Sequence, residues 1–194
     1  MIYAISRFAA WCLLKAFFSF KVYGRENLPK RGSFILASNH VSYADPIALG
    51  VACFRKCNFM AKSDLFKNKL FAWYLGSLNV FPVKRGSADY GALKEALRRL
   101  KGKDALILFP EGSRQDAETL SKEPEPGVGF LADKAGVAVI PAFIKGTQEA
   151  LPKGLRFPRP CSISVRFGKK INIERGLSYE GISQIIMQQI KNLA

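Results

Sequence analysis

The sequence predicts a single α/β domain with a mostly parallel central sheet flanked by helices, preceded by an amphipathic helix at the amino terminus. Short apolar runs alternate with amphipathic segments along the 194 residues, which is the pattern of βαβ units. Two of the runs, ALILF and VAVIPAFI, are apolar throughout, as expected for strands that helices cover on both faces. A chain of this length is predicted to bury a sizeable core as one domain.

The first predicted element is a helix within residues 1–23, separate from the α/β domain of residues 24–194. Its apolar side chains recur every three or four positions and form one stripe: Ile2, Ile5, Ala9, Leu13, Phe17 and Phe20. Arg7, Lys15 and Lys21 lie off this stripe, and no uncharged run is as long as a membrane span requires. Two interpretations remain open: a helix lying in a membrane interface, or a helix packed on the protein's own core.

The remaining elements follow in regular alternation. The predicted strands are Phe34–Ala37, Asn58–Ala61, Leu78–Val83, Ala105–Phe109, Val137–Ile144 and Ser162–Phe167. The predicted helices are Pro46–Phe54, Leu65–Tyr74, Tyr90–Leu100 and Val128–Lys134, with Tyr179–Leu193 closing the domain. The Pro-rich stretch of residues 151–160 is open to two interpretations, a surface loop or a second element that contacts a membrane.

The charge balance favours an anionic partner. Thirty Lys and Arg against 15 Asp and Glu give a net charge of +15, which attracts nucleic acid, an anionic membrane or a phosphate-bearing substrate. No nucleic-acid-binding motif accompanies the charge. The four cysteines are scattered, and His40 is the only histidine, so we expect reduced thiols and no metal site.

Polar residues of a reactive kind follow four of the predicted strands. They are His40, Lys62, Arg85 and the segment Glu111–Arg114. Because the carboxyl ends of parallel strands line the ligand crevice of an open α/β sheet, these side chains are expected to converge. The sequence therefore predicts a site for proton transfer on a phosphate-bearing substrate.

His40 and Asp45 form a His-x4-Asp pair. A neutral imidazole is suited to accept a proton near neutral pH, and a carboxylate bonded to its other nitrogen would fix the tautomer. The alternative is a loop histidine in a capped turn before Pro46. The pair by itself does not decide between the two.

The segment FPEGSR, residues 109–114, is the second candidate. Gly112 permits a tight turn at a strand end, and Arg114 offers a fork of donors that suits phosphate. Glu111 would bond a substrate hydroxyl or hold the turn. The alternative is a structural loop with an ordinary ion pair.

Gly127, Gly129 and Ala132 match the G-x-G-x-x-A form of the dinucleotide-binding fingerprint. That fingerprint requires a strand immediately before it. Here Pro124 and Pro126 precede it, and they are incompatible with a central strand. We therefore do not predict a dinucleotide site.

Four blocks in order, SNHVSYADP, VFPVKRG, FPEGSR and VIPAF, resemble those of the glycerolipid acyltransferase family, and in particular the 1-acylglycerol-3-phosphate acyltransferases. The resemblance covers residues 29–170 and implies that residues 24–194 are an acyltransferase domain. It implies His40 as the catalytic base with Asp45 as its partner. The implied substrate-binding residues are Lys62, Arg85, Glu111, Gly112, Ser113 and Arg114, with the three cations on phosphate. One departure is Glu125, where the family pattern usually has Lys.

The resemblance implies transfer of an acyl group from acyl-CoA or an acyl carrier protein thioester to the sn-2 hydroxyl of 1-acylglycerol-3-phosphate. It implies no metal, no prosthetic group and no nucleic acid, and a location at an anionic membrane surface on the cytoplasmic face. Two alternatives remain: the same chemistry on another lysolipid or on glycerol-3-phosphate, or a basic nucleic-acid-binding protein. A membrane-binding module without catalysis is disfavoured by the His40 and Asp45 pair.

Overall fold

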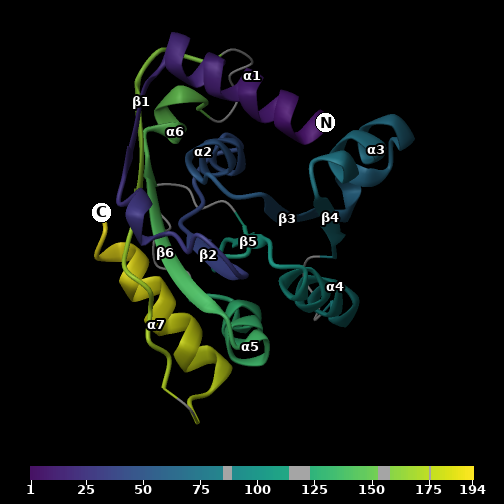
Figure 1. The fold of residues 1–194 in the computed structure, drawn as a ribbon, viewed down its shortest axis with the longest axis vertical. Helices are drawn as coiled ribbons and strands as arrows, with labels where there is room; N and C mark the ends of the chain where they lie inside the picture. Colours follow the sequence, from purple (N-terminus) through teal and green to yellow (C-terminus); the bar gives the residue numbers. More distant parts are fainter. Residues whose placement is uncertain (85–88, 114–122, 153–157, 175) are drawn as a thin grey trace.

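The computed structural model describes residues 1–84, 89–113, 123–152, 158–174 and 176–194. Within them, a seven-stranded sheet has the order β1-β7-β6-β2-β5-β3-β4 (Figure 1). The strands are β1 Ser19–Tyr23, β2 Phe34–Ser38, β3 Cys57–Lys62, β4 Val80–Val83, β5 Ala105–Leu108, β6 Ala138–Lys145 and β7 Ser162–Phe167. Strands β6, β2, β5, β3 and β4 are mutually parallel, while β7 runs antiparallel to β6 and parallel to β1. The predicted fold class is confirmed.

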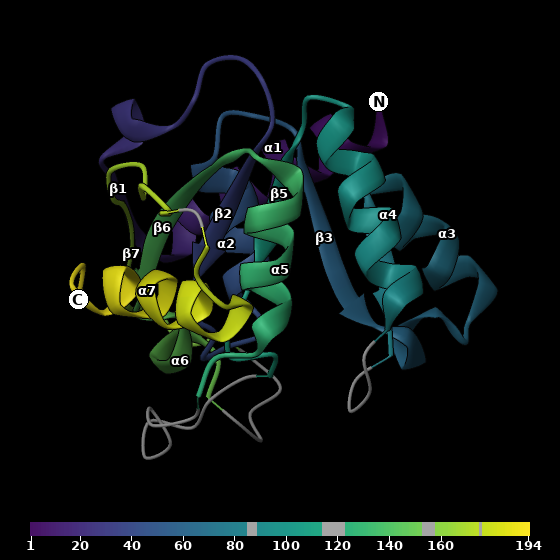
Figure 2. The same cartoon turned by 90° about the horizontal axis from the view of Figure 1, so that it is seen from below.

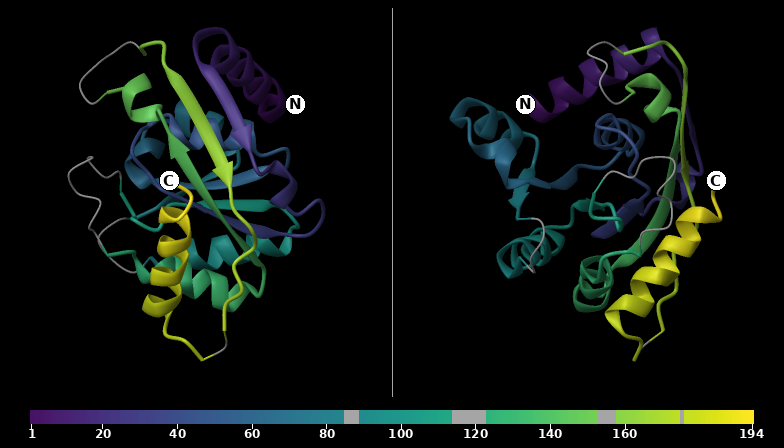
Figure 3. Two further views of the ribbon diagram at one scale, coloured as in Figure 1. Left: turned by 90° about the vertical axis from the view of Figure 1, so that its left-hand side faces the viewer. Right: turned by 180° about the vertical axis from the view of Figure 1, so that it is seen from behind.

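Helices form a layer on each face of the sheet. The helices are α1 Ile2–Phe17, α2 Asp45–Ala52, α3 Lys69–Ser77, α4 Tyr90–Lys101, α5 Pro126–Ala135, α6 Thr147–Ala150 and α7 Tyr179–Lys191, with short 3-10 turns at Arg25–Asn27 and Ser63–Phe66. Helices α4, α5 and α7 lie in front of the strands when the molecule is seen from below (Figure 2), and α1, α2 and α3 lie beyond them. The view from behind shows the same two layers (Figure 3).

Strand β2 contributes to both cores. Its alternate side chains Phe34 and Leu36 pack with α2 on one face, whereas Ile35 and Ala37 pack with α4, α5 and α7 on the other. All five of its residues are buried. A central strand covered on both faces explains the apolar runs in the sequence.

The amino-terminal helix is shorter than predicted. It ends at Phe17, and residues 19–23 form β1, which pairs with β7 at one edge of the sheet (Figure 3). Phe20 is buried in the core beside α1 instead of extending the helical stripe. The spacing of three between Phe17 and Phe20 matched a helical period by coincidence, because the strand alternation in SFKVY also places Phe20 inward.

The stripe on α1 does not pack on the core. Ile5, Leu13 and Phe17 are 60%, 56% and 59% exposed, and it is Leu14, on the opposite side of the helix, that is buried. Within the described residues, no helix combines the length and the apolar character needed to cross a bilayer.

The other predicted strands and helices are present, with shifted ends. Helix α3 begins at Lys69, because the Asn68 side chain caps it by accepting a hydrogen bond from the Phe71 N–H, at 3.0 Å. The sequence analysis missed β1, α6 and both 3-10 turns. Of the Pro-rich stretch, residues 153–157 lie outside the described residues.

Gly129 serves helix packing. A Cβ atom there would overlap the carbonyl oxygen of Tyr179 and lie 2.9 Å from the Ser183 hydroxyl oxygen. The Gly129 N–H donates to that hydroxyl, at 3.0 Å, and the hydroxyl donates to the Glu125 carbonyl. The glycine spacing that resembled a dinucleotide fingerprint therefore reflects close contact of α5 with α7.

We expect Gly129→Ala to lower the free energy of unfolding by ~1–3 kcal/mol, because α7 must move to accommodate the methyl group. Gly127→Ala is the matched control, since its nearest neighbour would be Leu93 at 3.9 Å; alanine in a helix is itself favourable by up to ~1 kcal/mol. Urea unfolding of both variants measures the difference. Equal stabilities would contradict the packing role.

Candidate active site

The loop after β2 brings His40 and Asp45 together. The His40 Nδ1 lies 2.9 Å from Asp45 Oδ2, and the same oxygen accepts the backbone N–H groups of Val41 and Ser42, each at 2.7 Å. Asp45 is fully buried at the start of α2. One carboxylate oxygen therefore holds both the imidazole and the loop that carries it. Because Nδ1 faces Asp45, Nε2 is left as the nitrogen able to take a proton from a substrate.

Two neighbours hold the histidine in place. The Phe109 ring stacks on the His40 ring with centroids 4.0 Å apart. The buried Asn39 side chain donates to the Ile144 carbonyl, at 2.9 Å, and accepts the Ile144 N–H, at 2.8 Å, which ties the loop to β6. The sequence analysis assigned neither residue a role, although both stand in the blocks SNHVSYADP and FPEGSR.

The FPEGSR turn meets the His40 loop from β5. Glu111 is 4% exposed, and its Oε2 accepts the backbone N–H of His40, at 2.7 Å. Gly112 has φ +67°, a left-handed conformation that a side chain would strain. Glu111 is thus placed to hold the turn against the loop, which was one of its two predicted roles.

Glu125 lies against the same turn. Its backbone N–H donates to the Pro110 carbonyl, at 2.8 Å, and a Cβ atom on Gly112 would lie 2.8 Å from Glu125 Cγ. The residue that departs from the family pattern therefore contacts the block around Glu111 directly.

Of the three predicted phosphate-binding cations, the described residues include Lys62. Lys62 is the last residue of β3, at the same edge of the sheet, where its ammonium pairs with Asp64. Asp64 also pairs with Lys67, at 2.9 Å, and the hydrogen bonds from these two lysines lower the pKa of Asp64 to about 2. Arg85 and Arg114 lie outside the described residues; Ser113 follows Gly112 in the described turn.

The described residues contain no group of His, Cys, Asp and Glu arranged to hold a metal ion. What the site contains is a buried imidazole tethered to a carboxylate at the carboxyl edge of a parallel sheet. This arrangement is suited to the activation of a hydroxyl group by general-base catalysis. The model of the family described as Acyltransferase matches residues 19–145, and the chain belongs to this family of O-acyltransferases.

Relatives agree with this assignment. The chain is 32% identical over 138 residues to a 1-acyl-sn-glycerol-3-phosphate acyltransferase of Bacillus subtilis, covering 69% of this chain and 68% of that protein. It is 31% identical over 157 residues to the enzyme of that name from Streptococcus pneumoniae, covering 79% of this chain and 56% of the relative. The crystal structure of PlsC, the 1-acyl-sn-glycerophosphate (LPA) acyltransferase of Thermotoga maritima, superimposes with a TM-score of 0.80 at 28% identity, covering 98% and 77% of the two chains.

Burial raises the pKa of Glu111 to about 7, and the hydrogen bond from the His40 N–H opposes this only in part. An exposed Glu titrates near ~4.3, so between this pH and about 7 the folded protein binds more protons than the unfolded chain. The contribution of Glu111 to stability is therefore complete below pH ~4.3 and is lost as the pH rises through about 7.

We accordingly expect Glu111→Gln, which still accepts the His40 N–H, to gain stability relative to the unmodified protein as the pH rises from about 5 to about 8. Urea unfolding at both pH values measures the change, with Glu180→Gln on the surface of α7 as control. A pH-independent difference between Glu111→Gln and the unmodified protein would show that Glu111 is ionised throughout.

Proposed function

We propose that this acyltransferase moves a fatty acyl group from acyl-CoA or an acyl carrier protein thioester to the sn-2 hydroxyl of 1-acylglycerol-3-phosphate. The observation that supports it most is the buried His40 and Asp45 pair, in a chain whose relatives carry the name 1-acyl-sn-glycerol-3-phosphate acyltransferase. The net charge of +15 suits a phosphate-bearing acceptor.

The proposed reaction has two proton transfers. His40 Nε2 takes the proton of the acceptor hydroxyl as its oxygen attacks the thioester carbonyl. The carbon–sulfur bond then breaks, and the leaving sulfur takes the proton back from the imidazolium, which gives the ester and a free thiol. Asp45 stabilises the imidazolium between the two steps. Stacking on Phe109 keeps the ring in one orientation, and no metal or prosthetic group enters the scheme.

Phosphate binding is assigned to Lys62, Arg85 and Arg114. Lys62 would exchange its partner Asp64 for the phosphate. Because both side chains are about half exposed, this exchange would change their burial only slightly. Lys62 stands at the end of β3, with only β5 between that strand and β2, which carries the His40 loop. A phosphate there would be within the same crevice as the base.

We place the enzyme at an anionic membrane surface, on the cytoplasmic face, because its acceptor is a lipid. The exposed stripe on α1, with Ile5, Leu13 and Phe17, supports membrane contact by this helix. Nucleic-acid binding would depend on charge alone, whereas membrane contact by α1 would also depend on apolar side chains. Salt should therefore weaken nucleic-acid binding more than membrane binding.

His40→Ala should reduce the acyl-transfer rate ~10²–10⁴-fold. Asp45→Asn should also be severe, because an amide can replace the acceptor oxygen for Val41 and Ser42 but cannot stabilise an imidazolium. The measurement is acyl transfer from labelled acyl-CoA or acyl carrier protein to lysophosphatidic acid, with circular dichroism as the test of folding. Unchanged turnover in His40→Ala would refute the mechanism.

Arg114→Ala should lower kcat/KM on lysophosphatidic acid, with a loss of ~2–5 kcal/mol in transition-state stabilisation, because it removes a charge-assisted contact to phosphate. Arg114→Lys should recover only part, since a point charge lacks the fork. Monoacylglycerol, which has no phosphate, is the matched control substrate and should show little loss. The same panel, extended to glycerol-3-phosphate and other lysolipids, identifies the acceptor. Equal losses on both acceptors would remove Arg114 from the phosphate site.

Leu13→Asp with Phe17→Asp should weaken vesicle binding at least ~10-fold, since each large apolar side chain contributes up to ~1.5–3 kcal/mol. Substitution is preferable to deletion, because Phe20 belongs to the core. Tyr90→Asp on α4, at an even more exposed position in the other layer, is the control. Co-sedimentation at low and high salt is the measurement. Binding that vanishes in salt, or that survives the double substitution, would contradict an apolar anchor on α1.

A further inference from the structure

Helix α3 is rich in apolar residues that remain accessible to solvent. Its sequence is KLFAWYLGS, and none of its residues is buried. Leu70 and Trp73 are 75% and 60% exposed, and Phe71 and Tyr74 are also exposed. A helix of this composition normally packs its apolar side on a core or on a partner. Something outside the described chain is therefore expected to cover it.

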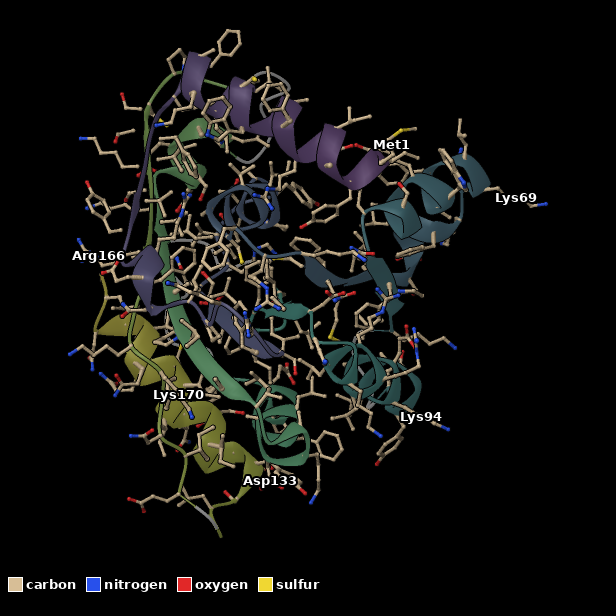
Figure 4. All side chains as sticks on the ribbon, viewed as in Figure 1. Met1, Lys69, Lys94, Asp133, Arg166 and Lys170 are labelled. Carbon is tan, nitrogen blue, oxygen red and sulfur yellow. The ribbon has the colours of Figure 1, made fainter. Side chains whose placement is uncertain are left out.

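Most of the exposed large apolar side chains belong to two segments of the chain. Among the described residues, every exposed large apolar side chain except Tyr23, Tyr90 and Leu177 belongs to residues 1–17 or 43–74. These two segments hold α1, α2 and α3, which belong to the same layer of helices (Figure 1). In Figure 4, Met1 and Lys69 lie on the side of this layer, whereas Lys94 and Asp133 lie on the opposite side.

Helices α1 and α3 contact each other through one pair of hydroxyl groups. The Ser6 hydroxyl of α1 hydrogen bonds to the Tyr74 hydroxyl of α3, at 3.0 Å. The exposed large apolar side chains of these two helices and of the turn before α3 are together called the apolar face; they are Ile5, Phe8, Trp11, Leu13, Phe17, Leu65, Leu70, Phe71, Trp73 and Tyr74. Exposed apolar surface of this extent marks a contact with lipid or with another protein.

The charges around α3 favour lipid over a second copy of the chain. Lys67 and Lys69 are exposed at its amino end, and Lys62 precedes the 3-10 turn that leads into it. The nearby Asp64 is already paired with Lys62 and Lys67. Two copies meeting through this face would bring like charges together, whereas Trp and Tyr beside Lys suit the headgroup level of an anionic bilayer.

We propose that α3, with Leu65, is a second membrane-contacting element, so that the enzyme rests on an anionic bilayer through α1 and α3 together. The inference rests on the proposed function only in that the acceptor is a bilayer lipid. Helix α3 follows Lys62 after one 3-10 turn. Its contact with the bilayer therefore fixes the distance between the bilayer and the carboxyl end of β3. One helix alone would hold the protein but leave it free to roll about that helix.

The two tryptophans of the chain report on the two helices separately. Trp11 lies on α1 and Trp73 on α3, so Trp73→Phe and Trp11→Phe each leave one probe. We expect Trp73 in the Trp11→Phe variant to shift its emission to the blue and to be quenched by brominated acyl chains when vesicles of phosphatidylcholine and phosphatidylglycerol are added. Trp11 in the Trp73→Phe variant should behave in the same way.

The outcomes are distinct. Quenching of Trp11 without quenching of Trp73 overturns the role of α3 and leaves the proposed anchor on α1 intact. Quenching of neither overturns both. A blue-shifted Trp73 without lipid, increasing with protein concentration, shows instead that a second copy covers α3.

Activity tests the consequence for orientation. Leu70→Asp with Trp73→Gln should lower the rate per bound enzyme ~10-fold on lysophosphatidic acid in vesicles, a loss of about 1.4 kcal/mol in transition-state stabilisation. It should leave the rate on a water-soluble short-chain acceptor unchanged. Tyr90→Asp is the control, and thermal unfolding verifies the fold. An equal loss on both acceptors would show that α3 acts through the fold and not through the bilayer.

Discussion

The buried carboxylate of Asp45 is the interaction on which the site depends. Its Oδ2 receives the Val41 and Ser42 N–H groups and faces His40 Nδ1, so one atom sets the loop, the ring orientation and the start of α2. A buried carboxylate needs hydrogen-bond donors, and the backbone donors to Asp45 Oδ2 belong to the loop that it organises. The geometry of the proposed catalytic pair and the local folding of the loop therefore have the same cause.

The turn after β5 is held to the loop after β2 by a hydrogen bond from the backbone of that loop. Glu111 accepts the His40 N–H, and Gly112 adopts a left-handed conformation that lets the turn after β5 approach. The burial that raises the pKa of Glu111 also shields its hydrogen bond to the His40 N–H from solvent. Two loops from neighbouring strands, β2 and β5, thus act as one unit.

The two helical layers meet different demands. The layer of α4, α5 and α7 closes a core, with Gly129 allowing α5 and α7 to touch. The layer of α1, α2 and α3 closes the other core with its inner side, through Leu14 and Leu49, and leaves its outer side apolar. A protein that works on a lipid needs such an asymmetry, because one surface must prefer hydrocarbon to water while the rest remains hydrated.

The sequence by itself determined the fold class and the approximate strands and helices, and it marked His40 and Asp45 as a candidate pair. These follow from apolar periodicity and from residues close together in the chain, which are local properties. Only the tertiary structure decided the rest. It showed that Ser19–Tyr23 is an edge strand, because pairing with β7, more than a hundred residues away, overrides a helical spacing. It decided that the stripe on α1 faces outward and that Lys62 holds Asp64, since the direction and the partner of a side chain depend on packing between distant segments.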